Sequence, residues 1–130
     1  YLRPWVKKKK AWAQSQMGSN YYQGEGVKRS YEMAAALWKL AAQQGEVNAM
    51  YNVGQLYEQG QGVEQSFERA KEYYEKAAAL GDAGAQFSLG LMYYQGNGVE
   101  KDLKKANELW TKSAILGHVG AIQALKHTDK

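Results

Sequence analysis

The sequence predicts an all-α protein, an α/α superhelical solenoid of antiparallel helix pairs, and three observations support that prediction. Small residues recur at a fixed spacing, since Gly18, Gly54 and Gly90 follow one another at intervals of 36 residues. A fixed period between roughly 20 and 50 residues is typical of stacked repeats. Between the glycines the apolar spacing is helical, and capping residues flank each expected helix. We therefore expect about three repeats of 36 residues plus a C-terminal capping helix.

The first helix of each repeat is predicted from one apolar face. Ala49, Val53, Leu56 and Tyr57 lie at i, i+4, i+7 and i+8, which is one side of a 3.6-residue helix. The other copies follow the same pattern up to a Gly-x-Gly-Val segment, where glycine permits the left-handed backbone that ends a helix. The expected first helices span residues 10–22, 46–59 and 82–95.

The second helix of each repeat is predicted from its caps. It starts after Ser30, Ser66 or Asp102, which are N-cap residue types. Glycines at positions 45, 81 and 117 end it. The expected second helices span residues 31–44, 67–80 and 103–116, and a last helix lies near 118–127.

Glycine within a helix needs an explanation, because each one costs about 1 kcal/mol relative to alanine. Gly18, Gly54 and Gly90 are all expected inside first helices. A large ring recurs at one position of the second helices, and we expect it to fill the space above the glycine. The three rings are Trp38, Tyr74 and Trp110.

The predicted organisation has five segments. Residues 1–9 are read as a helix remnant or an N-terminal cap, since Pro4 and the lysines fit poorly as a preceding second helix; Trp5 and Trp12 would cover the first unit. The polar C-terminal tail suits a capping unit. The other segments are the repeats 10–45, 46–81 and 82–117, and the capping helix with its tail, 118–130.

The composition argues against catalytic and cofactor sites. The chain has no cysteine, which excludes disulfides and thiolate metal sites. His118 and His127 lie near the C-terminus without carboxylates at ligand spacing, and His118 is read as part of a helix start. No nucleophile–base pair is apparent. We expect neither enzyme activity, nor a metal, nor a cofactor.

The charge distribution argues against a nucleic-acid partner. Arg3 and Lys7–Lys10 give +5 within the first ten residues, leaving 12 of the 17 basic and all 13 acidic side chains to the rest. No basic stripe follows the repeats, as nucleic-acid binding would require. No apolar run approaches the roughly 20 residues that cross a bilayer. We expect a soluble protein without membrane insertion, and the sequence assigns no compartment.

Residues 85–99 read Ala-Gln-Phe-Ser-Leu-Gly-Leu-Met-Tyr-Tyr-Gln-Gly-Asn-Gly-Val. This segment resembles the repeat of the Sel-one-like family, a relative of the tetratricopeptide repeat, and residues 49–63 and 13–27 follow it with Val53 and Met17 in place of leucine. The resemblance implies an adaptor that holds other proteins in assemblies. One secreted bacterial branch carries cysteine pairs and a suggested hydrolase activity. This chain departs from that branch, so the hydrolase alternative is the least favoured.

In such a superhelix the first helices line the concave surface. Side chains on their open side do not recur between copies, which favours a groove that binds a peptide or a helical segment. The alternative is that these side chains pack on the next unit, or on a second copy in a self-associating structural module. The predicted partner-binding residues are Tyr22, Asn48, Tyr51, Gln55, Glu58, Gln59, Phe87, Leu91, Tyr94 and Gln95.

Overall fold

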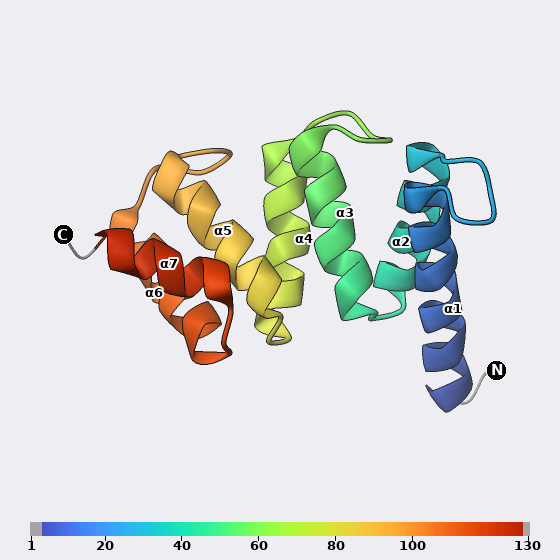
Figure 1. Ribbon diagram of the computed structural model, residues 1–130, viewed down its shortest axis with the longest axis horizontal. Helices are drawn as coiled ribbons and strands as arrows, with labels where there is room; N and C mark the ends of the chain where they lie inside the picture. Colours follow the sequence, from blue (N-terminus) through green and yellow to red (C-terminus); the bar gives the residue numbers. More distant parts are fainter. Residues whose placement is uncertain (1–3, 129–130) are drawn as a thin grey trace. The chain divides into compact units, whose positions relative to one another are not determined.

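The computed structural model describes the backbone of residues 4–128 and the side chains of residues 7–128. Within that range every regular element is an α-helix, and no strand occurs (Figure 1). The helices are α1 (Pro4–Gln23), α2 (Tyr31–Gln43), α3 (Val47–Gln59), α4 (Phe67–Ala79), α5 (Ala83–Gln95), α6 (Leu103–Ile115) and α7 (Val119–Thr128).

The chain divides into two compact units on either side of the Ser66–Phe67 bond. In the first unit α1 packs on α2 and α2 on α3; in the second, α4 packs on α5, α5 on α6 and α6 on α7. Consecutive helices within each unit run in opposite directions (Figure 1). The predicted fold class, all-α with stacked helix pairs, is confirmed.

The predicted helices agree with the observed ones to within one residue, except at the start of α1. This helix begins at Pro4, where proline is tolerated because the first helical N–H has no intrahelical partner. Lys7–Lys10 then continue the helix, since lysine is a good helix former, and their side chains are exposed. The expected covering by Trp5 lies outside the described side chains; Trp12 itself is 59% exposed.

The helix ends follow the predicted chemistry. Carboxylates of Glu46 and Asp82 accept hydrogen bonds from the backbone N–H groups of Ala49 and Ala85, at 3.0 and 2.8 Å. His118 takes the same place before α7, where its Nδ1 accepts from the N–H of Ala121 at 3.2 Å. This confirms His118 as a capping residue.

The space above two of the in-helix glycines is occupied by tryptophan. A Cβ added to Gly18 would lie 2.5 Å from Nε1 of Trp38, and one added to Gly90 would lie 2.5 Å from Nε1 of Trp110. Each indole also donates a hydrogen bond into the facing helix, from Trp38 to the Ser15 carbonyl at 2.9 Å and from Trp110 to the Phe87 carbonyl at 3.3 Å.

One core cluster of the second unit gathers around Trp110. Ala106, Trp110 and Ala121 form its buried centre. Phe87 is half-buried against this centre and stacks on the His118 ring at a centroid distance of 4.7 Å. Through Phe87, α5 therefore packs on both α6 and the start of α7.

Helix α1 leaves uncovered a face that the later first helices bury. Ala49, on α3, is fully buried, whereas its counterpart Ala13 is exposed. Met17 is 49% exposed where Val53 is fully buried. The face of α1 that includes Ala13 and Met17 is therefore open.

Gly90→Ala is expected to destabilise the protein although alanine is the better helix former. The added methyl must displace the Trp110 indole, and overpacking of this kind costs about 1–3 kcal/mol. Losing the indole hydrogen bond adds about 1 kcal/mol to this destabilisation. The higher helix propensity of alanine offsets about 1 kcal/mol of it. Urea denaturation should show a net loss of about 1–3 kcal/mol. The exposed control Ala36→Gly should lose only the propensity difference, about 1 kcal/mol. A more stable Gly90→Ala protein would contradict the ring–glycine packing.

Phe87→Ala is expected to lower the unfolding free energy by about 2 kcal/mol, because a half-buried ring leaves the Trp110 cluster. Tyr94→Ala removes a ring that is 41% exposed and should cost about 1 kcal/mol or less. Thermal and urea unfolding of the two variants, compared with the wild type, test this order. A larger loss from Tyr94→Ala would show that the assignment of Phe87 to the core is wrong.

Candidate functional site

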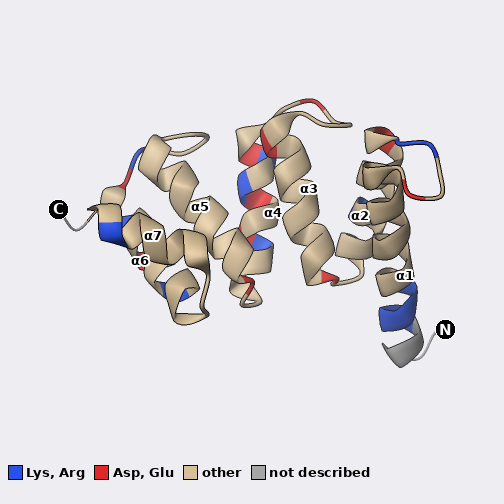
Figure 2. Ribbon diagram, in the orientation of Figure 1, with Lys and Arg blue, Asp and Glu red and all other residues tan. Residues whose placement is uncertain are grey.

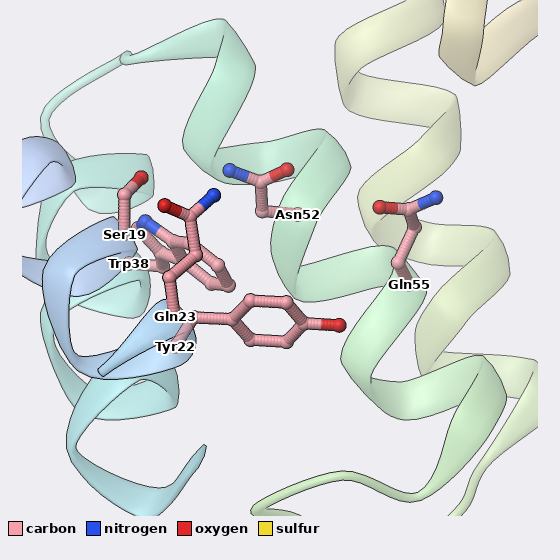
Figure 3. Close-up of a pocket in the computed structure, with 6 residues that line it drawn as sticks. All are labelled: Ser19, Tyr22, Gln23, Trp38, Asn52 and Gln55. Carbon is pink, nitrogen blue, oxygen red and sulfur yellow. The ribbon is translucent and has the colours of Figure 1, made fainter. Parts of the chain in front are cut away.

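A pocket with a volume of about 180 Å³ opens between α1, α2 and α3 of the first unit (Figure 3). We call it the α1–α3 pocket. Its wall comes from the C-terminal turns of α1 on one side and the middle of α3 on the other, with the side chain of Trp38 from α2 between them. The residues that line it are Ser19, Tyr22, Gln23, Trp38, Asn52 and Gln55.

The aromatic part of this pocket is fixed by contacts within the unit. Trp38 is only 5% exposed and is held by its hydrogen bond to the Ser15 carbonyl. The Tyr22 ring packs on Trp38 at a centroid distance of 5.4 Å and on Tyr31 at 5.1 Å. The Tyr22 hydroxyl donates to Oε1 of Gln61 at 3.2 Å. Both rings therefore have defined positions without a ligand.

The rest of the lining is polar and uncharged. Ser19 Oγ donates to the Ser15 carbonyl at 3.3 Å, and Gln55 Nε2 donates to the Tyr51 hydroxyl at 2.9 Å. Gln55 Oε1, and the whole carboxamides of Gln23 and Asn52, make no hydrogen bond to any residue that the structure describes. Figure 3 shows the Gln23, Asn52 and Gln55 amides around one opening. The pocket thus presents unused donors and acceptors and no formal charge.

The second unit contains a tyrosine–tryptophan ring pair like that of the α1–α3 pocket, 72 residues later in the sequence. We call this ring pair the frame, and it allows the linings of the two units to be compared. Tyr94 packs on Trp110 at 5.3 Å and an interplanar angle of 38°, and Tyr22 packs on Trp38 at 5.4 Å and 38°. Gln95 is the counterpart of Gln23. The ring pair therefore recurs in the first and third repeats, whereas the middle repeat has Glu58 in place of the tyrosine.

The other three lining positions differ between the units. Leu91 and Ala124 pack against the Trp110 cluster, at the positions where the first unit has Ser19 and Asn52. His127 corresponds to Gln55. Because the same frame tolerates leucine and alanine here, the fold does not require the polar lining of the α1–α3 pocket.

The structure brings two of the sequence-predicted residues, Tyr22 and Gln55, into the α1–α3 pocket. Tyr51 adjoins it through its hydrogen bond with Gln55. Asn48 lies instead in a second cavity of about 450 Å³, beside Trp12 and the α2–α3 turn. Two further predicted residues lie at the end of α3: Glu58 is half-buried and Gln59 is exposed.

The predicted residues of the second unit fall into two groups. Phe87 and Leu91 are half-buried and pack on their own unit's core. Tyr94 and Gln95 are exposed at the end of α5. Of the four, Tyr94 therefore offers the most accessible ring.

Four lining residues are not among the predicted partner-binding residues: Ser19, Gln23, Trp38 and Asn52. Asn52 is three residues after Ala49 and falls at the edge of the buried arc. Comparing the copies could have found it, because its counterparts are Gln16, Ser88 and Ala124 and so do not recur.

Charge is concentrated away from α3 and α5. Helix α5 contains no charged residue and α3 contains only Glu58, whereas α4 has six (Figure 2). Among the described residues, no group of three histidine or acidic side chains is placed to hold a metal ion. No helix of the described part is both long and apolar enough to span a bilayer.

The sequence-family model of the Sel1 repeat matches this chain three times, at residues 13–46, 47–82 and 83–118. The fold is similar to that of c5321, a protective antigen of uropathogenic Escherichia coli with an SLR fold, at a TM-score of 0.88 and 32% identity. A Sel1 repeat protein from Oxalobacter formigenes is similar at a TM-score of 0.83 and 33% identity. The cysteine rich protein B of Helicobacter pylori is similar at a TM-score of 0.70 and 26% identity.

The chain is shorter than two of these proteins. The matches cover 90%, 87% and 92% of this chain, but 25%, 46% and 96% of the respective structures. No curated protein sequence matches it. Three consecutive matches to one repeat model, together with the shared fold, show that the chain belongs to the Sel1 repeat family.

Proposed function

We propose that the chain is a non-enzymatic protein-interaction module that binds a polypeptide segment of another protein over the first helices, with the α1–α3 pocket as its main contact in the first unit. Sel1 repeat proteins generally mediate protein–protein interaction and are typically scaffolds without catalytic activity. The finer assignment to this surface is our own. It keeps the predicted residues and adds Ser19, Gln23 and Asn52.

The observation that supports the proposal most is the polar lining of the α1–α3 pocket. Polar groups that face a pocket and lack internal partners are available to a ligand once water is displaced. Leu91 and Ala124 show that apolar residues fit the same frame. Ser19 and Asn52 therefore have no structural role that leucine and alanine could not fill, and a binding role accounts for them.

Each unit contributes further predicted residues outside the α1–α3 pocket. In the first unit, Tyr51 lies beside the pocket, Glu58 and Gln59 follow along α3, and Asn48 lines the neighbouring cavity. In the second unit, Tyr94 is the favoured anchor because its ring is accessible, and Gln95 lies next to it. Phe87 and Leu91 contribute through the area that their own packing leaves exposed. Tyrosine is enriched among the residues that carry most of the energy at interfaces.

The proposal predicts that exchanging the pocket lining removes binding without removing the fold. Peptides would be selected on the intact chain from a random display library, and their affinities measured by calorimetry. The double variant Ser19→Leu/Asn52→Ala copies two of the three lining positions at which the second unit differs, and it retains Gln55. It should keep the helicity and melting temperature of the wild type and bind the selected peptides at least about tenfold more weakly, a change of about 1.4 kcal/mol.

Glu108→Ala, on the exposed face of α6, is the matched control and should bind like the wild type. The proposal is wrong if no peptide is selected. It is also wrong if the selected peptides bind the double variant as tightly as the wild type.

Self-association is a second candidate function, favoured by the open face of α1. This face exposes the apolar side chains of Trp12, Ala13 and Met17, and a contiguous exposed apolar patch is typical of an interaction surface. The counterparts of Ala13 and Met17 are buried on α3, at Ala49 and Val53, and on α5, at Ala85 and Leu89.

Light scattering on the eluting protein, from micromolar to millimolar concentration, separates this candidate from a monomer. Self-association through α1 should give a dimer that Trp12→Ser/Met17→Ser weakens at least about tenfold. A monomer throughout that range would eliminate the candidate.

A further inference from the structure

We propose that the α1–α3 pocket selects an uncharged carboxamide, the side chain of an asparagine or glutamine in the bound polypeptide, over the carboxylate of aspartate or glutamate. This inference rests on the proposed function, because it names the group of the partner that enters the pocket. It is carried by the size of the pocket, its hydrogen-bonding groups and its lack of charge.

The size of the pocket fits one side chain. Its volume is about 180 Å³. A cavity of about 150 Å³ is enough to hold a benzene molecule. The pocket can therefore hold a group the size of a glutamine side chain, but not a helix or a folded surface element. The rings of Trp38 and Tyr22 provide an apolar wall for the methylene groups of such a side chain.

The hydrogen-bonding groups call for a ligand that both donates and accepts. Asn52 and Gln23 each offer an unused carbonyl oxygen and an unused NH₂ group, and Gln55 offers an unused Oε1. A carboxamide carries one acceptor and two donors in one plane, so it matches this set. A carboxylate only accepts, and it would leave Gln55 Oε1 without a donor. An apolar side chain would leave all three amides unpaired, which is costly once water is displaced.

The electrostatics also disfavour a charged ligand. None of the six lining residues is charged. Burying a carboxylate without a cation costs much more than burying a neutral amide. Two cations of the same unit are engaged with aromatic rings: Lys39 Nζ lies 5.1 Å from the Tyr57 ring centroid, and the Arg29 guanidinium lies 5.9 Å from that of Tyr31. The pocket therefore has no lining partner for a negative charge, and no carboxylate for a positive one.

The second unit provides the internal reference. There the frame of Tyr94 and Trp110 is retained, while Leu91 and Ala124 pack on the core in place of the polar lining. The same fold thus exists with and without the carboxamide-lined pocket, and the differences are confined to known positions. This supplies a variant that changes the chemistry and retains the packing.

The test uses three blocked amino acids as probes of the intact ¹⁵N-labelled chain. The N-acetyl amide of glutamine carries the carboxamide, and that of glutamate carries a carboxylate at neutral pH. The N-acetyl amide of methionine is an apolar probe of similar size. The readouts are the NMR signals of the Asn52, Gln23 and Gln55 side-chain amides and of the Trp38 indole N–H. Probes of this size are expected to bind in about the millimolar range.

The glutamine probe should shift these signals saturably, and the glutamate and methionine probes should bind at least about tenfold more weakly. In Ser19→Leu/Asn52→Ala the glutamine-specific shifts should disappear while the remaining spectrum stays that of the folded protein. Asn52→Leu is a second variant that removes one carboxamide and retains Ser19, and it should weaken the glutamine probe at least about fivefold, since one of three carboxamides is lost.

Equal binding of the glutamine and glutamate probes would overturn the inference, and so would tighter binding of the methionine probe. Absence of a saturable shift with all three probes would also overturn it. If display-selected peptides still bound the wild type and not the double variant in that case, the proposed function would stand and only the assignment of the carboxamide would fail. Failure of both experiments would overturn both proposals.

Discussion

The packing of a tryptophan ring on a glycine determines how closely the helices approach in both units. Trp38 lies over Gly18 and Trp110 lies over Gly90, each at a distance that leaves no room for a Cβ. The ring can then reach the backbone of the facing helix and donate to the carbonyl three residues before the glycine. The glycine costs about 1 kcal/mol in the helix, and an unpaired buried indole N–H would cost about 1–3 kcal/mol. Removing a buried ring costs about 3–5 kcal/mol, so the ring contact outweighs the glycine.

The same contact places the candidate site. Because Trp38 is fixed, the Tyr22 ring that packs on it is fixed as well, and together they form one side of the α1–α3 pocket. The second unit repeats this geometry with Tyr94 and Trp110. The candidate site therefore differs from its counterpart in the second unit at three side chains, which surround the same kind of ring pair. Residues that recur between the units determine the fold, and residues that differ, such as Ser19 and Leu91, determine what each surface presents.

The sequence predicted the helices and caps well because their causes are local. Glycine with positive φ ends α3 and α5, and the residues before α3, α5 and α7 cap them through single hydrogen bonds. The ring–glycine contact was also predictable, since a helix glycine that recurs needs a partner that recurs.

The depth of side chains at the edge of a helix face was not predictable in the same way. Periodicity places Phe87 on the open side of α5, yet its ring packs against the Trp110 cluster and His118. That outcome depends on a small neighbour on α7, Gly120, where an added Cβ would lie 3.1 Å from Cζ of Phe87. Asn52 lies one position further along α3 than Tyr51, the counterpart of Phe87, and its depth is likewise not given by the periodicity of α3 alone. The burial of a side chain at such a position depends on the helix that packs against it. The apolar pattern of one helix alone does not predict that burial.

The distribution of charge connects the fold to the kind of recognition that this surface supports. The charged residues of the described helices lie mainly on the second helix of each pair and on the first turns of α1, and α3 and α5 together carry one (Figure 2). Long-range electrostatic steering needs a charged patch, and the first helices of both units lack one beyond the start of α1. The affinity of the proposed interaction would then come from hydrogen bonds and buried rings, which act only at contact distance. The carboxamide selectivity that we propose for the α1–α3 pocket meets that requirement, because it depends on matching donors to acceptors and not on attraction between charges.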